Sequence, residues 1–221
     1  MRIAIIGAGR LGGALGQRLL EAGHRVTFSG GASAAEAAST IEAHAAASSR
    51  EAATWADVVI LAVPFAAIED AIEEAGRLEG KVLWSCVSAL RSDYSGLAVG
   101  FDTSAAEQVA SYAPGARLVA AIPPFAEALS SRHLRYDAGL TPTVFVCGDD
   151  ADAKSLIEKL VSEIGAEPVD AGPLEAARLV EPAMMLLVRI AYSGLPRDVG
   201  LRLLERTGVQ AERHRDERET S

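Results

Sequence analysis

Several features that mark particular classes of protein are scarce or missing in this sequence. Only two of its 221 residues are cysteines, which is too few for a disulfide framework. Cys86 and Cys147 both lie in apolar runs of strand length, where a thiol is usually an inert small hydrophobic group. We therefore assign them no chemistry.

Positive charge is scarce as well. The chain has 21 Lys and Arg residues against 30 Asp and Glu residues, which gives a formal net charge of -9. Nucleic acids and anionic membrane surfaces attract proteins that carry a basic face, so neither is an expected partner. A small-molecule partner fits this composition better.

Membrane-spanning runs, a leader segment and metal-ligand spacings are also absent. No run of 18 uninterrupted apolar residues is present that would span a membrane. Met1 to Ile6 leads into glycines after one strand's length, unlike a signal peptide. No histidine has a second ligand at metal spacing, so we expect no metal site; the four are His24, His44, His133 and His214. The sequence thus predicts a soluble, cytoplasmic protein.

Apolar runs of strand length alternate with longer segments of helical period. This alternation is typical of an α/β protein with a doubly wound, mostly parallel sheet. Each run is nearly continuous in apolar residues, as burial on both faces of a sheet demands. The expected strands are Arg2–Ile6, Arg25–Phe28, Val58–Val63, Lys81–Trp84, Leu118–Ala121 and Thr143–Cys147. A surface helix and a short peripheral strand are expected between Ser33 and Ala53.

The strongest chemical signal is the turn between the first strand and the first helix, Gly7-Ala8-Gly9-Arg10-Leu11-Gly12. Gly7 permits the tight turn, Gly9 lets the backbone approach a pyrophosphate, and Gly12 allows close helix packing. The helix start adds free N–H donors and a positive dipole. Arg10 could lie along the pyrophosphate or be a solvated arginine at a helix start. The pattern predicts a Rossmann dinucleotide-binding domain.

We divide the chain accordingly into three parts. Residues 1–150 form the Rossmann domain, residues 151–204 form a C-terminal helical extension, and residues 205–221 form a charged tail that we expect to be disordered. The extension ends in a long apolar helix, 174–192. Its apolar strip either packs on the Rossmann domain or forms a homodimer.

The end of the second strand normally selects between NAD and NADP. No carboxylate follows Phe28 to hold a ribose 2′-hydroxyl, so NAD lacks its usual anchor. Ser29, the amides of Gly30 and Gly31, and Ser33 could cradle a 2′-phosphate, which favours NADP while leaving NAD possible. Ser29 and Ser33 are equally compatible with ordinary turn and helix-cap serines.

The sequence resembles the NADP oxidoreductases that use the deazaflavin coenzyme called factor 420. The resemblance runs over nearly the whole chain and rests on the glycine turn and four further stretches. These are Val63-Pro64-Phe65, Val146-Cys147-Gly148-Asp149-Asp150, Asp170-Ala171-Gly172-Pro173-Leu174 and Ala177-Arg178-Leu179-Val180-Glu181. It implies that Val63, Pro64, Phe65 and Ser85 line the cofactor site and that residues 172–181 close the pocket.

Two stretches differ from the family's pattern. Gly30, Gly31 and Ala32 stand where NADP-specific members have a serine and arginines. Pro123, Pro124 and Phe125 stand where the family has a polar pair facing the deazaflavin. We expect the second substrate to bind where Pro123 to Phe125 meets the final helix.

No acid, base or other catalytic side chain stands out. Glu181 is either buried in the pocket or paired with Arg178 one helical turn away, and we favour pairing. Asp149 and Asp150 are expected to cap the helix that begins at Ala151. Hydride transfer between two stacked cofactors needs mainly positioning and exclusion of water, so this absence is compatible with an oxidoreductase.

Three functions therefore stay open. The first is hydride transfer between NADP(H) and a second small redox molecule, possibly the deazaflavin. The second is an NAD(P)H-dependent imine or carbonyl reductase, as in the related pyrroline-carboxylate reductases. The third is a dinucleotide-binding regulatory module without turnover.

Overall fold

The computed structural model describes residues 1–30, 32–41, 43–193 and 199–205. In this part of the chain, eight strands form one sheet in the order β3-β2-β1-β4-β5-β6-β7-β8. Their bounds are β1 (Arg2–Ile6), β2 (Arg25–Ser29), β3 (His44–Ala45), β4 (Val58–Leu61), β5 (Val82–Ser85), β6 (Arg117–Ala121), β7 (Thr143–Gly148) and β8 (Glu167–Gly172). Neighbouring strands are parallel except β6 and β7.

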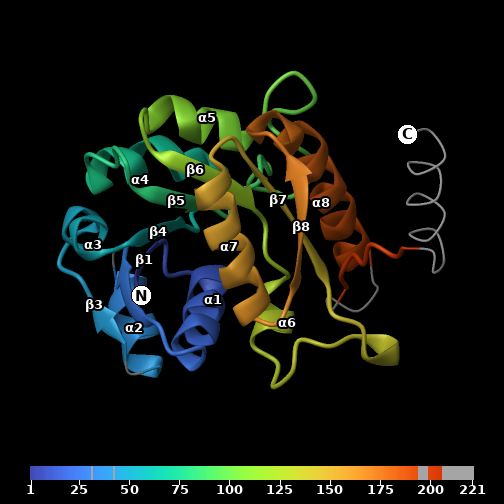
Figure 1. Ribbon diagram of the computed structural model, residues 1–221, viewed down its shortest axis with the longest axis horizontal. Helices are drawn as coiled ribbons and strands as arrows, with labels where there is room; N and C mark the ends of the chain where they lie inside the picture. Colours follow the sequence, from blue (N-terminus) through green and yellow to red (C-terminus); the bar gives the residue numbers. More distant parts are fainter. Residues whose placement is uncertain (31, 42, 194–198, 206–221) are drawn as a thin grey trace, which may run out of the picture.

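Helices cover both faces of this sheet (Figure 1). They are α1 (Arg10–Glu21), α2 (Ala32–Thr40), α3 (Ser49–Trp55), α4 (Ile68–Ala75), α5 (Ala105–Tyr112), α6 (Ala126–Leu129), α7 (Ala151–Glu163) and α8 (Ala177–Tyr192). Single 3-10 turns lie at Phe65–Ala67, Asp137–Gly139 and Leu174–Ala176. One apolar core lies under α1, α2, α6 and α7, and a second lies under α3, α4, α5 and the start of α8.

The reversal at β7 determines where the last helix lies. Because β7 is antiparallel to β6 and β8 is parallel to β7, the chain leaves β8 near the amino edge of the other strands. Helix α8 then returns along the sheet toward their carboxyl edge, where Met184 and Leu187 meet Ile122 and Pro124. The final helix thereby reaches the edge that carries the glycine turn.

The α/β fold predicted from the sequence is confirmed, including the mostly parallel sheet and the C-terminal helix. The strand expected at Val58–Val63 is shorter than predicted, because β4 ends at Leu61, although the N–H of Ala62 still donates to the carbonyl oxygen of Ile6 at 2.8 Å. β8 joins the same sheet as the first 150 residues, so the extension continues that sheet. Of the predicted tail, residues 206–221 lie outside the described residues.

Candidate dinucleotide-binding site

Gly7 directly follows β1 and has a backbone conformation that only glycine adopts without strain. Its φ is +99°, and a Cβ built there would lie 2.5 Å from the carbonyl oxygen of Ala62. Its N–H donates to the carbonyl oxygen of Ser29 at 3.0 Å. The turn is therefore fixed between the ends of β2 and β4.

Gly12 and Gly16 allow α1 to pack closely on the sheet. A Cβ at Gly12 would lie 2.0 Å from the carbonyl oxygen of Gly7, and one at Gly16 would lie 2.4 Å from the ring of Phe28. Any larger residue at either position would push the helix outward. This contact holds the start of α1 directly above the end of β1.

Gly9 differs from these glycines because it faces open space. It is the N-cap residue of α1, with φ −69° and ψ −168°, and no side chain caps this end of the helix. A Cβ at Gly9 would meet no atom of the described residues within 4 Å, its two chain neighbours aside. A helix start with uncapped N–H groups and a clear approach is suited to an anion such as a pyrophosphate.

The remaining residues of the turn differ in exposure. Ala8 is buried and Leu11 is half-buried, so both support the turn by packing. Arg10 is exposed, and its guanidinium donates to the Glu127 carboxylate of α6 at 2.5 Å.

The end of β2 lies against the glycine turn. Gly30, with φ +115°, is so close that a Cβ there would lie 3.3 Å from the nitrogen of Gly7. Ser29 is buried, and its Oγ has no hydrogen-bond partner among the described residues. Ser33 is exposed, and its hydroxyl donates to the carbonyl oxygen of Gly30 at 3.1 Å. The predicted 2′-phosphate cradle thus combines one exposed and one buried serine, while its Gly31 lies outside the described residues.

The exits of β4 and β5 complete this edge of the sheet. Val63 lies against the glycine turn. Its Cγ1 is 2.8 Å from the position that a Cβ on Gly7 would occupy. Pro64 is exposed and Phe65 begins a 3-10 turn. Ser85, the last residue of β5, is fully buried, and its Oγ accepts from the N–H of Val87 at 3.3 Å. Ser85 is the register partner of Leu61, so the two exits lie side by side.

The segment after β6 packs on the final helix. Pro123 and Pro124 are buried and Phe125 is half-buried. Pro124 and Phe125, with Met184 and Leu187 of α8, line a cavity of only about 10 Å³. A space of this size holds about one water molecule, so this contact is apolar packing and a substrate would have to lie on its outer side.

Comparison with known proteins agrees with this geometry. Residues 2–89 match the family model described as NADP oxidoreductase coenzyme F420-dependent. The F420-dependent NADP reductase of Methanothermobacter marburgensis is 32% identical over 167 residues, which are 71% of this chain and 72% of that protein. The chain belongs to the coenzyme F420-dependent NADP oxidoreductase family.

Solved structures show the same fold. A crystal structure from Arthrobacter sp. FB24 superposes with a TM-score of 0.81 at 24% identity, covering 93% of this chain and all 100% of that chain. An imine reductase from Pseudomonas sp. superposes with a TM-score of 0.65 at 19% identity, covering 86% of this chain and 62% of the other. At these identities the likeness concerns the fold alone.

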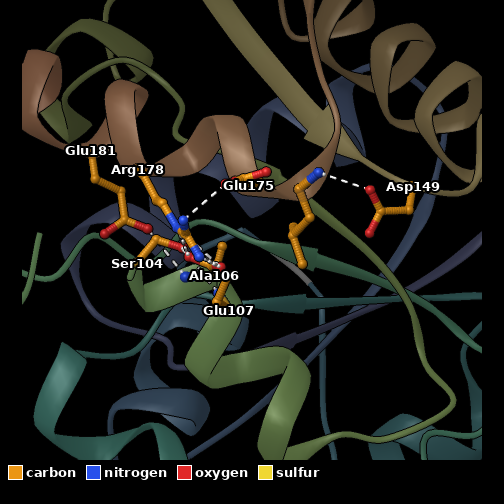
Figure 2. A network of polar contacts seen from close by, with 8 residues as sticks. Ser104, Ala106, Glu107, Asp149, Glu175, Arg178 and Glu181 are labelled. Atoms are coloured by element: carbon orange, nitrogen blue, oxygen red, sulfur yellow. Dashed lines mark hydrogen bonds and ion pairs between the residues drawn. The ribbon is translucent and has the colours of Figure 1, made fainter. Parts of the chain in front are cut away.

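The stretch Ala177 to Glu181, part of the resemblance to this family, attaches α8 to α5. Glu181 is only 3% exposed, and its carboxylate accepts from the N–H groups of Ala89, Ala105 and Ala106 at 3.2, 3.0 and 3.1 Å. Figure 2 shows this carboxylate directed at the start of α5. Burial raises the pKa of Glu181, while the three N–H groups act in the opposite direction.

The favoured pairing of Glu181 with Arg178 is therefore wrong. Glu181 is buried, as in the alternative, but it lies against backbone N–H groups and lines none of the cavities found in the described residues. Arg178 instead donates to Glu107 at 2.7 to 3.2 Å and to Glu175 at 2.9 Å (Figure 2). Hydrogen bonds from Arg178 lower the pKa of Glu107. The sequence alone does not reveal the contact of Arg178 with Glu107. It does offer one signal, because Ser104 and Glu107 have the spacing of a capping box, and the Ser104 side chain caps α5.

Other polar groups have structural roles. Asp150 caps α7 by accepting from the N–H of Ala153 at 2.9 Å, which confirms the capping prediction for that residue. Asp149 accepts from the N–H of Leu174 at 3.0 Å (Figure 2). Burial raises the pKa of the Cys86 thiol and raises that of Cys147 to about 11, so both thiols stay protonated at neutral pH.

Within the described residues, no three His, Cys, Asp or Glu side chains come together in a way that would hold a metal ion. No helix there is long and apolar enough to cross a bilayer.

Proposed function

We propose that the chain binds NADP(H) at the glycine turn and exchanges hydride between it and coenzyme F420 or a related deazaflavin. The observation that carries this proposal is the uncapped start of α1, which Gly7 and Gly12 fix in place and Gly9 leaves open. Family membership supports the identity of both redox partners. The nicotinamide and the deazaflavin supply the hydride chemistry.

The protein's part in this proposal is binding and positioning. The pyrophosphate would lie on the N–H groups at residues 9–12, and the adenosine ribose would lie toward Gly30 and Ser33. Val63 to Phe65 and Ser85 would line the nicotinamide side, because both strand exits border the turn. The deazaflavin would lie against the outer side of the segment Pro123 to Phe125, chiefly against Phe125, which is half-buried whereas the two prolines are buried.

This proposal is tested by mixing the purified protein with NADPH, then with the deazaflavin, and following both cofactors by absorbance. We expect NADPH binding and stoichiometric oxidation of NADPH with reduction of the deazaflavin. Binding without transfer to any acceptor would reject the enzymatic proposal, and absence of NADPH or NADH binding at millimolar concentration would reject the site.

A second candidate is an imine or carbonyl reductase with the same cofactor site. The apolar Pro123, Pro124 and Phe125 favour it, because an imine substrate needs no polar pair to hold a flat deazaflavin. NADPH oxidation with a panel of imines, ketones, flavins and the deazaflavin separates the two. Turnover with the deazaflavin alone would remove this candidate.

We also propose that α8 forms a homodimer and that residues 151–204 act as a pocket-closing extension of residues 1–150. The outer side of α8 carries Leu179 and Leu186, which are 72% and 59% exposed. Apolar side chains so exposed on one helix are typical of an interface. Leu186→Arg is expected to yield monomers in light scattering, whereas Leu140→Arg, at another exposed leucine, should not. A wild-type monomer would reject the dimer.

A further inference from the structure

Arg10 is placed to contact the proposed pyrophosphate, but a carboxylate already holds it. It is the first residue of α1 and directly follows Gly9. Its Nη2 donates to Oε1 of Glu127 at 2.5 Å. The two side chains are 69% and 32% exposed, so the pair lies at the surface beside the glycine turn.

This ion pair is not needed to hold α6 against α1. Arg18, two turns further along α1, donates from Nε to the carbonyl oxygen of Leu129 at 2.7 Å and from Nη2 to that of Ser131. Helices α1 and α6 lie side by side through these contacts (Figure 1). Because exposed ion pairs contribute little to stability, Arg10 can exchange its partner at small cost to the fold.

A pyrophosphate at Gly9 would be a stronger partner for Arg10 than Glu127 is. A guanidinium binds phosphate oxygens through two parallel hydrogen bonds, and the pyrophosphate carries two negative charges beside the same helix start. The Glu127 carboxylate would then be a negative charge close to that anion and would repel it, because the Arg10 side chain can reach both.

We propose that Arg10 is a pyrophosphate ligand that Glu127 holds in the cofactor-free protein, so that Glu127 lowers the affinity for the cofactor. This inference rests on the proposed dinucleotide site. Binding transfers Arg10 from the carboxylate to the pyrophosphate and leaves Glu127 without its cation. Glu127 lies two residues after Phe125, so the transfer also makes the proposed second-substrate side more negative.

The test is the dissociation constant of NADPH, measured by fluorescence for the wild type, Glu127→Gln, Arg10→Gln and the double variant. At about 0.01 M salt, where screening is weak, Glu127→Gln should bind NADPH about 3-fold to 10-fold more tightly. Arg10→Gln should bind about 10-fold more weakly. In the Arg10→Gln background, the gain from Glu127→Gln should be clearly smaller, because the competition for Arg10 is gone. At about 1 M salt the gain should largely disappear.

A matched control is Glu79→Gln, which removes the carboxylate of another exposed pair, Arg77 with Glu79, at 89% and 67% exposure. It should leave the dissociation constant unchanged, and all variants should keep the wild-type melting temperature within a few degrees. Unchanged or weaker binding by Glu127→Gln at low salt would overturn the inference, as would unchanged binding by Arg10→Gln. A wild type that binds no dinucleotide would instead reject the proposed site itself.

Discussion

Replacing Gly9 with valine separates a ligand-binding role of the glycine turn from a structural one. The backbone of Gly9 is in the extended region, at φ −69° and ψ −168°, which valine adopts readily. Within the part of the chain that the structure describes, a Cβ there meets no atom within 4 Å beyond its chain neighbours, so we expect the free energy of unfolding to change by less than about 1 kcal/mol. The branched side chain would instead occupy the space in front of the α1 N–H groups.

The expected loss of cofactor affinity follows from those N–H groups. A hydrogen bond to a charged partner contributes about 1.5 to 3 kcal/mol, so blocking two of them costs about 3 kcal/mol or more. This corresponds to at least about a 100-fold rise in the dissociation constant of NADPH. We would measure it by fluorescence titration, with the urea midpoint of the ligand-free protein as the stability readout and Gly9→Ala as the smaller step in size. A folded Gly9→Val protein that binds NADPH as tightly as the wild type would refute the assignment.

Variants at three further positions test how the site and the helices around it are held. Gly12→Ala places a Cβ 2.0 Å from the carbonyl oxygen of Gly7 and should lower the free energy of unfolding by about 2 to 3 kcal/mol in urea titrations. Glu181→Ala leaves three N–H groups without an acceptor and should cost about 3 kcal/mol, with Glu181→Gln less damaging; equal stability of all three proteins would contradict this. Asp150 has its pKa lowered by Arg117, so its contribution is present above pH 3.8 and is lost as the pH falls further. Asp150→Asn should therefore melt below the wild type at pH 7, with a difference that shrinks toward pH 3; a constant difference would speak against the ion pair.

The parts of the fold that can be predicted from the sequence are those determined by residues close together along the chain. A run such as Val58 to Leu61 is apolar at every position because both faces are covered, and all four residues are fully buried. Gly7 and Gly12 could be assigned roles because a turn of this length leaves no room for a side chain at either position. The short β3 could be anticipated only as a peripheral strand, since two residues carry no periodicity.

Contacts between distant segments could not be predicted in this way. Arg178 and Glu181 are one turn apart on α8, so their spacing alone favours a pair. Whether they meet depends on what lies opposite, and the start of α5 presents both a carboxylate, Glu107, and free N–H groups. The arginine therefore binds the carboxylate and the glutamate binds the N–H groups. The pairing of Arg10 with Glu127 could not be predicted for the same reason, because the two residues are 117 positions apart in the sequence.

Two segments of the family resemblance, the glycine turn and the stretch 177–181, consequently carry different information. In the glycine turn, Gly9 leaves space that no side chain of the described ranges fills, so this segment bears on a ligand. In the stretch 177–181, the polar atoms of Arg178 and Glu181 are engaged with α5 and the segment at Ala89. That second stretch bears on how α8 is held against the carboxyl-edge segments. A chain that kept the α8 contacts but lost the open turn would be expected to keep this fold and lose the cofactor.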